Sequence, residues 1–139
     1  MNPSPPSSRP PSPPMRHLLD VNLLLAAIWA GHPQHAKAFA WLSGKNVMLC
    51  PLSELGFLRI STNKKAINAP MRKARELLNQ FATDRKAARI ADNLPALDSH
   101  PDKSEEVTDH YLADLAALNG ARLATLDQNL IHSSVDVIL

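Results

Sequence analysis

Cysteines and long apolar runs are scarce in this sequence, and each scarcity excludes a class of protein. Cys50 is the only cysteine in 139 residues, so neither an internal disulfide nor a cysteine-rich zinc site is possible. We therefore expect the chain to work in a reducing compartment, the cytoplasm. The longest apolar run, residues 23–30, is far shorter than the ~20 residues that span a bilayer. Asp20 and Asn22 also interrupt the stretch where a secretory signal is uniformly apolar, so the sequence predicts neither a membrane segment nor an export signal.

Aromatic residues are the second scarcity, at 4% of the chain. Trp29, Trp41, Tyr111 and the phenylalanines fall on apolar helix faces, where core packing is expected. So few aromatics disfavour recognition of single-stranded bases by stacking. Any contact with nucleic acid is then expected to be mainly electrostatic.

Proline and charge are present but unevenly distributed. Residues 1–14 hold seven of the twelve prolines, which predicts a disordered leader, and residues 15–139 have the composition and length of one globular domain. The net charge is only +2, yet residues 59–89 carry nine Lys/Arg against two acids, and residues 92–114 carry seven acids against one lysine. These segments are candidates for an anion-binding face and an acidic site; the alternative is two solvated helix faces of opposite sign.

Hydrophobic periodicity predicts strands that alternate with helices. Short apolar runs predict strands at residues 16–19, 46–50, 88–91, 122–125 and 135–139. Apolar spacing with proline and glycine at the ends predicts helices over residues 21–30, 33–42, 51–60, 70–81 and 108–119, the last with Thr108 as N-cap, and a loop over residues 92–104. Such alternation indicates parallel pairing through crossovers. The predicted fold class is therefore α/β, with three layers around a central, mainly parallel sheet.

Four acids are expected to meet at one edge of this sheet. Ligands bind parallel sheets at the carboxyl ends of the strands. The acids expected at this edge are Asp20, Glu54, Asp109 and Asp127. Singly, each can be a helix-end or turn residue. Together, carboxylates within ~5 Å repel by roughly 3 kcal/mol per pair at an effective dielectric of ~20, so a positive species is expected among them. An all-oxygen donor set suits Mg²⁺ or Mn²⁺, whereas His32 and His35 lack a third ligand for zinc.

Other polar residues near these acids are weaker candidates for the predicted site. Asn22 and Thr125 each stand two residues from a candidate acid, where they can support a carboxylate or serve as turn residues. Asp114 lies roughly 140° around the helix from Asp109 and is expected at the periphery. His110 is expected on the surface, and no role is predicted for His132 or His17.

The residues at this point resemble a known family. The stretches RHLLDVNLLLAAIW, LCPLSELGFLRISTN and VTDHYLADLAALNGARLATLDQNL are similar to the motif blocks of PIN-domain ribonucleases, most closely the VapC-type toxins of bacterial toxin–antitoxin systems. The resemblance covers nearly all of residues 15–139. It implies that Asp20, Glu54, Asp109 and Asp127 are the family's metal-binding quartet, supported by Asn22. Arg59 and Asn63 fall where family members carry an Arg and a Thr-Asn pair.

The resemblance also implies an activity and partners. The expected reaction is hydrolysis of RNA phosphodiesters by water activated on Mg²⁺ or Mn²⁺. A cognate antitoxin protein and a homodimer are expected as well. RNA backbone contacts are expected from the basic residues Arg59, Arg72, Lys73, Arg75, Arg85, Lys86 and Arg89.

Two other functions remain open at this point. One is a catalytically inactive PIN-like module that binds RNA or protein. The other is a receiver-type signalling domain, which fits poorly because the second predicted strand ends in Cys50 and Pro51 rather than in an aspartate.

Overall fold

The fold is described from a computed structural model, in which residues 14–138 are placed. The leader predicted over residues 1–14 lies outside the described residues except for Pro14. Five parallel strands form one sheet in the order β3-β2-β1-β4-β5. The strands are β1 (Arg16–Leu19), β2 (Asn46–Leu49), β3 (Ala88–Arg89), β4 (Arg122–Thr125) and β5 (Val135–Val137). The predicted α/β class with a parallel sheet is confirmed.

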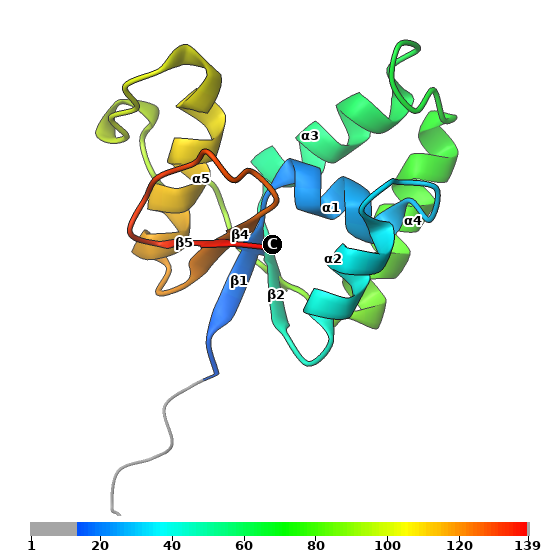
Figure 1. The fold of residues 1–139 in the computed structure, drawn as a ribbon, viewed down its shortest axis with the longest axis horizontal. Helices are drawn as coiled ribbons and strands as arrows, with labels where there is room; N and C mark the ends of the chain where they lie inside the picture. Colours follow the sequence, from blue (N-terminus) through cyan, green and yellow to red (C-terminus); the bar gives the residue numbers. More distant parts are fainter. Residues whose placement is uncertain (1–13, 139) are drawn as a thin grey trace, which may run out of the picture.

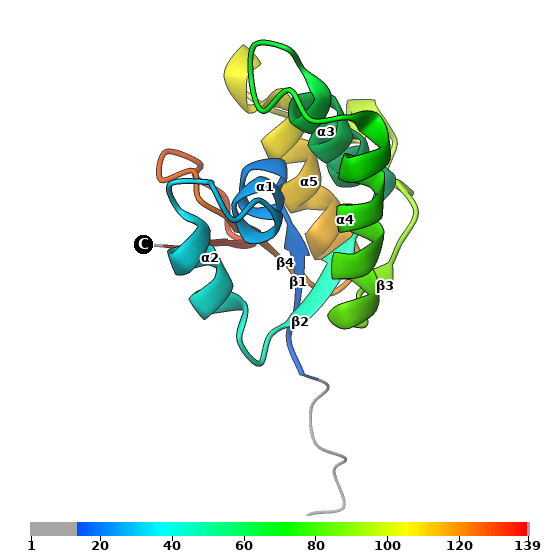
Figure 2. The ribbon, with the colours of Figure 1, turned by 90° about the vertical axis from the view of Figure 1, so that its right-hand side faces the viewer.

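Helices cover both faces of the sheet, unequally (Figure 1). One face carries α1 (Val21–Ile28), α2 (His35–Leu42), α3 (Pro51–Thr62) and α4 (Met71–Asp84). The other face carries α5 (Val107–Leu118), preceded by the short 3₁₀ turns Ala96–Asp98 and Ser104–Glu106. Figure 2 shows α4 beside the short strand β3, at the edge of the molecule. Among the described residues, no helix has the length and apolar character needed to cross a membrane.

The strands alternate their side chains between two cores. In β1, Leu18 packs with α5 while Leu19 packs with α1 to α4, and in β4 Leu123 and Ala124 divide in the same way. This period of two is expected of a sheet buried on both faces. The acid that follows β1, Asp20, therefore emerges between the two layers.

Close packing of α3 on α1 fixes where α1 begins. A Cβ built on Gly56 of α3 would lie 2.6 Å from Cγ2 of Val21, the first residue of α1. Only glycine permits this approach of the two helices. Val21 directly follows Asp20, so the contact also holds the carboxyl end of β1 in place.

Several predicted boundaries are wrong by a few residues. Helix α5 begins at Val107 rather than after an N-cap at Thr108, because the 3₁₀ turn over Ser104–Glu106 runs directly into it. Helix α2 begins at His35 rather than residue 33, and α1 ends at Ile28 because Trp29 is extended. The predicted strands 88–91 and 135–139 shorten to Ala88–Arg89 and Val135–Val137. Edge strands pair on one side only, and their ends lose partners first.

Candidate active site

The Asp20 carboxylate lies at the centre of the site and is 1% exposed. Its Oδ1 accepts a hydrogen bond from the Val21 backbone N–H at 2.6 Å and so caps α1. Its Oδ2 accepts a hydrogen bond from the Thr125 hydroxyl at 2.7 Å, and its backbone N–H donates to the Ala124 carbonyl at 3.0 Å. The sheet order β1-β4 explains this junction, since both strands end at the same edge.

A network of hydrogen bonds ties the end of β4 to the start of α1. The Asn22 side-chain oxygen accepts from the Leu126 backbone N–H at 3.3 Å and from the Thr125 hydroxyl at 3.4 Å. The Thr125 hydroxyl oxygen in turn accepts from the Asp127 backbone N–H at 3.0 Å. The Asp127 carboxylate also accepts a hydrogen bond from the Asn129 backbone N–H at 2.9 Å. Asp127 therefore also serves as a turn residue, the alternative that the sequence analysis gave for it. Thr125 therefore contacts both Asp20 and Asp127, whereas Asn22 is linked to these acids through Thr125.

Asp109, in the first turn of α5, lies close enough to Asp20 for each carboxyl to affect the pKa of the other. Burial, reinforced by the charge of Asp20, raises the pKa of Asp109 to about 7. Burial likewise raises the pKa of Asp20, although the hydrogen bonds from Thr125 and Val21 act in the opposite direction. The charge of Asp127 adds to the repulsion felt by both. Asp20, Asp109 and Asp127 come from separate elements and lie near enough for their charges to interact, and we call them the Asp20 cluster.

Glu54, the fourth predicted acid, has a different neighbour. It lies in the first turn of α3, and its Oε2 is 3.6 Å from Nη2 of Arg89. Glu54 and Arg89 line a cavity of about 620 Å³ between α3, α4 and the end of β3. Arg72 and Arg75 of α4 line the same cavity. The structure therefore pairs Glu54 with Arg89, in a cavity that Arg72 and Arg75 also line.

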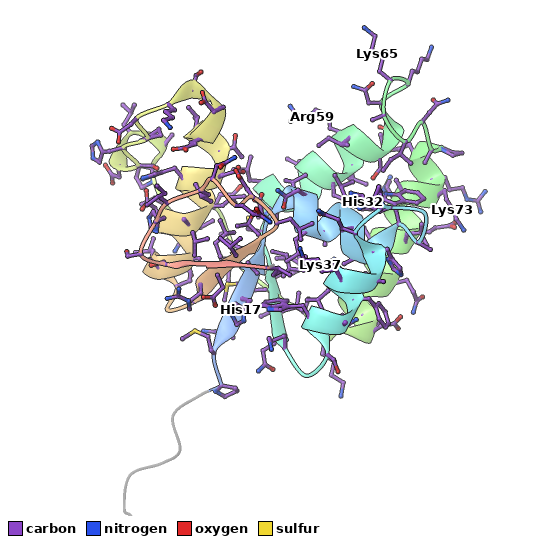
Figure 3. The ribbon with its side chains drawn as sticks, in the orientation of Figure 1. His17, His32, Lys37, Arg59, Lys65 and Lys73 are labelled. Atoms are coloured by element: carbon purple, nitrogen blue, oxygen red, sulfur yellow. The ribbon has the colours of Figure 1, made fainter. Side chains whose placement is uncertain are left out.

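The predicted basic residues divide into two sets. Arg59 and Lys73 lie exposed on the outer sides of α3 and α4 (Figure 3), on the same helices as the cavity of Arg72, Arg75 and Arg89. Arg85 and Lys86 belong elsewhere. The Arg85 guanidinium packs over Phe39 and Phe81 and donates to the Leu42 carbonyl at 3.1 Å. Lys86 lines a cavity with Arg16 and Asn46, which start β1 and β2, so the structure does not bring this pair to the acids.

A second polar cluster escaped prediction from the sequence. The Asp114 carboxylate accepts hydrogen bonds from Ser99 Oγ at 2.8 Å and from His132 Nε2 at 2.7 Å, and it lies 3.0 Å from His110 Nδ1. Its peripheral position was predicted, but the surface position expected for His110 was wrong, because the ring is partly buried against Asp114. The i, i+4 spacing of His110 and Asp114 was the available signal. We call these four residues the Asp114 cluster.

The Asp114 cluster is better described as a structural hydrogen-bond network than as a metal centre. Potential ligand atoms of His110, Asp114 and His132 lie within 4.8 Å of one another. However, His132 Nδ1 accepts a hydrogen bond from the Ser134 backbone N–H at 3.0 Å, which leaves the ring hydrogen on Nε2, facing Asp114. A metal-binding histidine instead donates through its second nitrogen. Although burial acts to raise it, the hydrogen bonds from His132 and Ser99 lower the pKa of Asp114 below its usual value.

Comparison with known proteins gives a consistent set of relatives. The PIN domain family model matches residues 17–135. Ribonuclease VapC38 of Mycobacterium tuberculosis is 33% identical over 123 residues, covering 79% of this chain and 84% of the relative. Ribonuclease VapC39 of the same organism is 33% identical over 131 residues, covering 86% and 94%, and Ribonuclease VapC44 is 33% identical over 131 residues, covering 87% and 92%.

A solved structure supports the same fold. The crystal structure of VapBC2 from Rickettsia felis, bound to a DNA fragment from their promoter, matches with a TM-score of 0.56 at 15% identity. The match covers 83% of this chain and 90% of that chain. At such low identity the likeness bears on the fold alone.

Proposed function

The chain belongs to the PIN-domain family, among the VapC ribonucleases, and from this we propose that it is an endoribonuclease, the toxin of a toxin–antitoxin pair. The observation that carries the proposal is the Asp20 cluster. Its aspartates come from the ends of β1 and β4 and from the first turn of α5, and they are held together without a cationic side chain among the contacts described above. Repulsion between neighbouring carboxylates lowers the stability of the fold, so a functional role accounts for their arrangement.

A divalent cation fits this donor set. Asp20 and Asp109 are close neighbours, and both burial and the charge of Asp20 raise the pKa of Asp109. Oxygen-only ligands suit Mg²⁺ or Mn²⁺. We propose that Asp20 and Asp109 hold the ion, with Asp127 and Glu54 completing its water shell or holding a second ion. A bound cation supplies two things, a lowered pKa of bound water and neutralisation of charge on the scissile phosphate.

The chain's own residues orient the acids and the substrate. The Thr125 hydroxyl fixes the rotamer of Asp20, and Asn22 fixes the turn that carries Asp127. Arg72, Arg75 and Arg89 line one wall beside Glu54, where we propose that they bind RNA phosphates, with Arg59 and Lys73 farther out. Arg85 and Lys86 do not enter this proposed surface.

Family membership also supports the proposed partners and location. We propose an antitoxin protein as the natural inhibitor, a homodimer as the assembly, and the cytoplasm as the site of action. Copurification of the chain with the protein encoded beside it, followed by mass measurement of the complex in solution, tests the first two.

The activity is tested with purified protein freed of any antitoxin. Total cellular RNA is incubated with Mg²⁺, with Mn²⁺ or with EDTA, and the fragments are sequenced, with Asp20→Asn as the control. We expect discrete fragments that require the metal and vanish in the variant. Full cleavage by Asp20→Asn in Mg²⁺ would overturn the site assignment, and no cleavage by a folded wild-type protein would favour an inactive binding module.

A further inference from the structure

A second cavity opens on the α5 side of the molecule. Its volume is about 320 Å³, within the range of small-ligand sites, and its walls are mainly apolar. Leu52 from α3, Leu94 from the loop before α5, and Val107 and Tyr111 from α5 form these walls. Asp92, an exposed residue, adds a carboxylate to the lining. An apolar slot with one charged group is the usual form of a site for a flat polar ring.

The wall contributed by the loop is fixed rather than free. The Tyr111 hydroxyl donates to the Leu94 carbonyl at 2.7 Å, which holds the aromatic ring at the side of the cavity. Ser99, which lines the cavity, donates to Asp114 at 2.8 Å and is 8% exposed. The Asp114 cluster therefore has a structural consequence, because it pins the loop that closes this cavity. Tyr111 is only partly buried, and its expected role in core packing was incomplete.

The cavity adjoins the Asp20 cluster. Thr108 lines it and directly precedes Asp109 in α5. Leu52 lines it from α3, two residues before Glu54. The cavity and the Asp20 cluster therefore share the first turn of α5, through Thr108 and Asp109. In a single-stranded RNA, the group next to the phosphate is a base, which can be turned out of the stack.

The polar group of the cavity limits which base fits. The Asp92 carboxylate lines the cavity, and its charge reinforces the effect of burial in raising the pKa of the Cys50 thiol and of the Tyr111 hydroxyl. In the described part of the chain, no cationic side chain lies at ion-pair distance from Asp92. A carboxylate without a cationic partner offers two acceptor oxygens to a ligand that carries two donors.

We propose, on the basis of the proposed nuclease function, that this cavity binds a guanine base adjacent to the cleaved phosphodiester and that Asp92 reads its Watson–Crick edge. Guanine presents two parallel donors there, N1–H and the N2 amino group, which match a carboxylate. Adenine and cytosine present one amino group beside an acceptor nitrogen, and uracil presents one N–H between two carbonyls. Each of these would place an acceptor against the carboxylate, which is unfavourable. Leu52, Leu94 and Tyr111 pack on the faces of the ring.

The proposal is tested by cleavage of a random-sequence oligoribonucleotide with wild-type protein and Mg²⁺ or Mn²⁺, followed by sequencing of the ends. We expect guanine at one fixed position beside the cut. Matched oligonucleotides carrying guanine, inosine or adenine at that position then give kcat/KM values. Inosine lacks the N2 amino group, so we expect a loss of about 10-fold, with a larger loss for adenine, in line with ~1–3 kcal/mol for a bidentate base contact.

Asp92→Asn is the decisive variant, because an amide offers one acceptor and one opposing donor. We expect kcat/KM for the guanine substrate to fall about 10-fold or more, and the ratio between guanine and inosine substrates to approach one. Asp98→Asn is the matched control, an exposed acid of the same loop that does not line the cavity. It should leave the ratio unchanged. Circular dichroism and thermal melting confirm that both variants fold.

The outcomes separate this proposal from the proposed function. If the wild type cleaves RNA without a guanine preference, or if Asp92→Asn keeps the preference, the guanine site is wrong and the nuclease stands. If Asp92→Asn instead weakens binding of the antitoxin and leaves base preference intact, the cavity is a protein-docking site and the guanine proposal is overturned. Absence of any metal-dependent cleavage refutes the proposed function itself.

Discussion

Helix α5 carries two partly buried aspartates whose pKa values move in opposite directions. Asp109 faces Asp20 and Asp127, and its pKa is raised to about 7. Asp114, little more than one turn further along, faces His110, His132 and Ser99, and its pKa is lowered. Both side chains are partly exposed, and burial acts to raise the pKa of each. At Asp109 the neighbouring acids add to the effect of burial, whereas at Asp114 the hydrogen-bond donors outweigh it.

The comparison shows that the neighbours of a buried acid distinguish a functional site from a structural contact. Asp114 has donors for its oxygens and thereby joins the loop before α5 to the turn that follows β4. Asp109 and Asp20 have each other, an arrangement that is unfavourable until a cation or a proton enters it. We infer that the hydrogen bonds of Asp114 stabilise the fold. The pairing of Asp109 with Asp20 lowers stability and serves the activity.

The largest expected effect is on RNA cleavage. Asp109→Asn should reduce cleavage by at least ~100-fold, since even indirect supports of a metal ligand contribute about 10- to 100-fold. Asp114→Asn should remain within about 10-fold of the wild type, because it changes a support of the loop. Initial rates on one defined RNA, at saturating Mg²⁺, compare the two. Equal losses in both variants would erase the distinction between the clusters.

The second effect concerns stability of the metal-free protein at pH 8. The pKa of Asp109 is about 7 in the folded state against 3.8 for the ordinary carboxyl, so folding becomes less favourable as pH rises through this window. The full pKa shift corresponds to about 4 kcal/mol, and solvent screening of this partly exposed carboxyl reduces it, so Asp109→Asn should raise the free energy of unfolding by roughly 2 kcal/mol at pH 8. At pH 4 the gain should disappear. Urea unfolding in EDTA at both pH values measures it, and a pH-independent gain would contradict the titration.

A cation should remove this instability, which is the third prediction. At about ten times its dissociation constant, Mg²⁺ or Mn²⁺ should raise the free energy of unfolding of the wild type by about 1.4 kcal/mol. Asp20→Asn and Asp109→Asn should respond far less, while Asp114→Asn should respond like the wild type. Thermal melting over a metal titration gives the result. A full response in Asp109→Asn would place the ion elsewhere.

The smallest effect is expected at Asp114. Because its pKa is lowered in the folded state, its contribution is present above the ordinary carboxyl pKa and is lost as pH falls through the folded value. Asp114→Asn should therefore destabilise the protein by about 1 kcal/mol at pH 6, a hydrogen-bond-sized loss, and by less at pH 3. Equilibrium unfolding at the two pH values checks this. A variant as stable as the wild type at pH 6 would show that the hydrogen-bond network contributes nothing.

Much of the fold was predictable from the sequence, because its signals are local. Buried strands followed by helices of ten or more residues indicate a parallel sheet, and breakers such as Gly44 and Gly120, both at positive φ, mark where helices turn back to strands. Boundaries were less predictable. The start of α5 depends on a 3₁₀ turn whose residues have no apolar period.

The candidate site was predictable only where topology is simple. Asp20 and Thr125 meet because β1 and β4 are adjacent parallel strands that end at one edge. The approach of Asp109 depends on how α5 lies across the sheet, and the pairing of Glu54 with Arg89 depends on a two-residue edge strand. The Asp114 cluster was missed because His132 comes from a loop on the far side of β4.

The contact between Asp20 and Thr125 joins residues 105 positions apart, and this sets an order of events during protein synthesis. A growing chain exposes Asp20 well before its partner on β4, which is made 105 residues later. At ~5–20 residues per second, roughly 5 to 20 s separate the two ends of the contact. The acidic centre is therefore incomplete until Thr125 and Asp127 have been made and have left the ribosome, so no active nuclease exists beside the ribosome before that point.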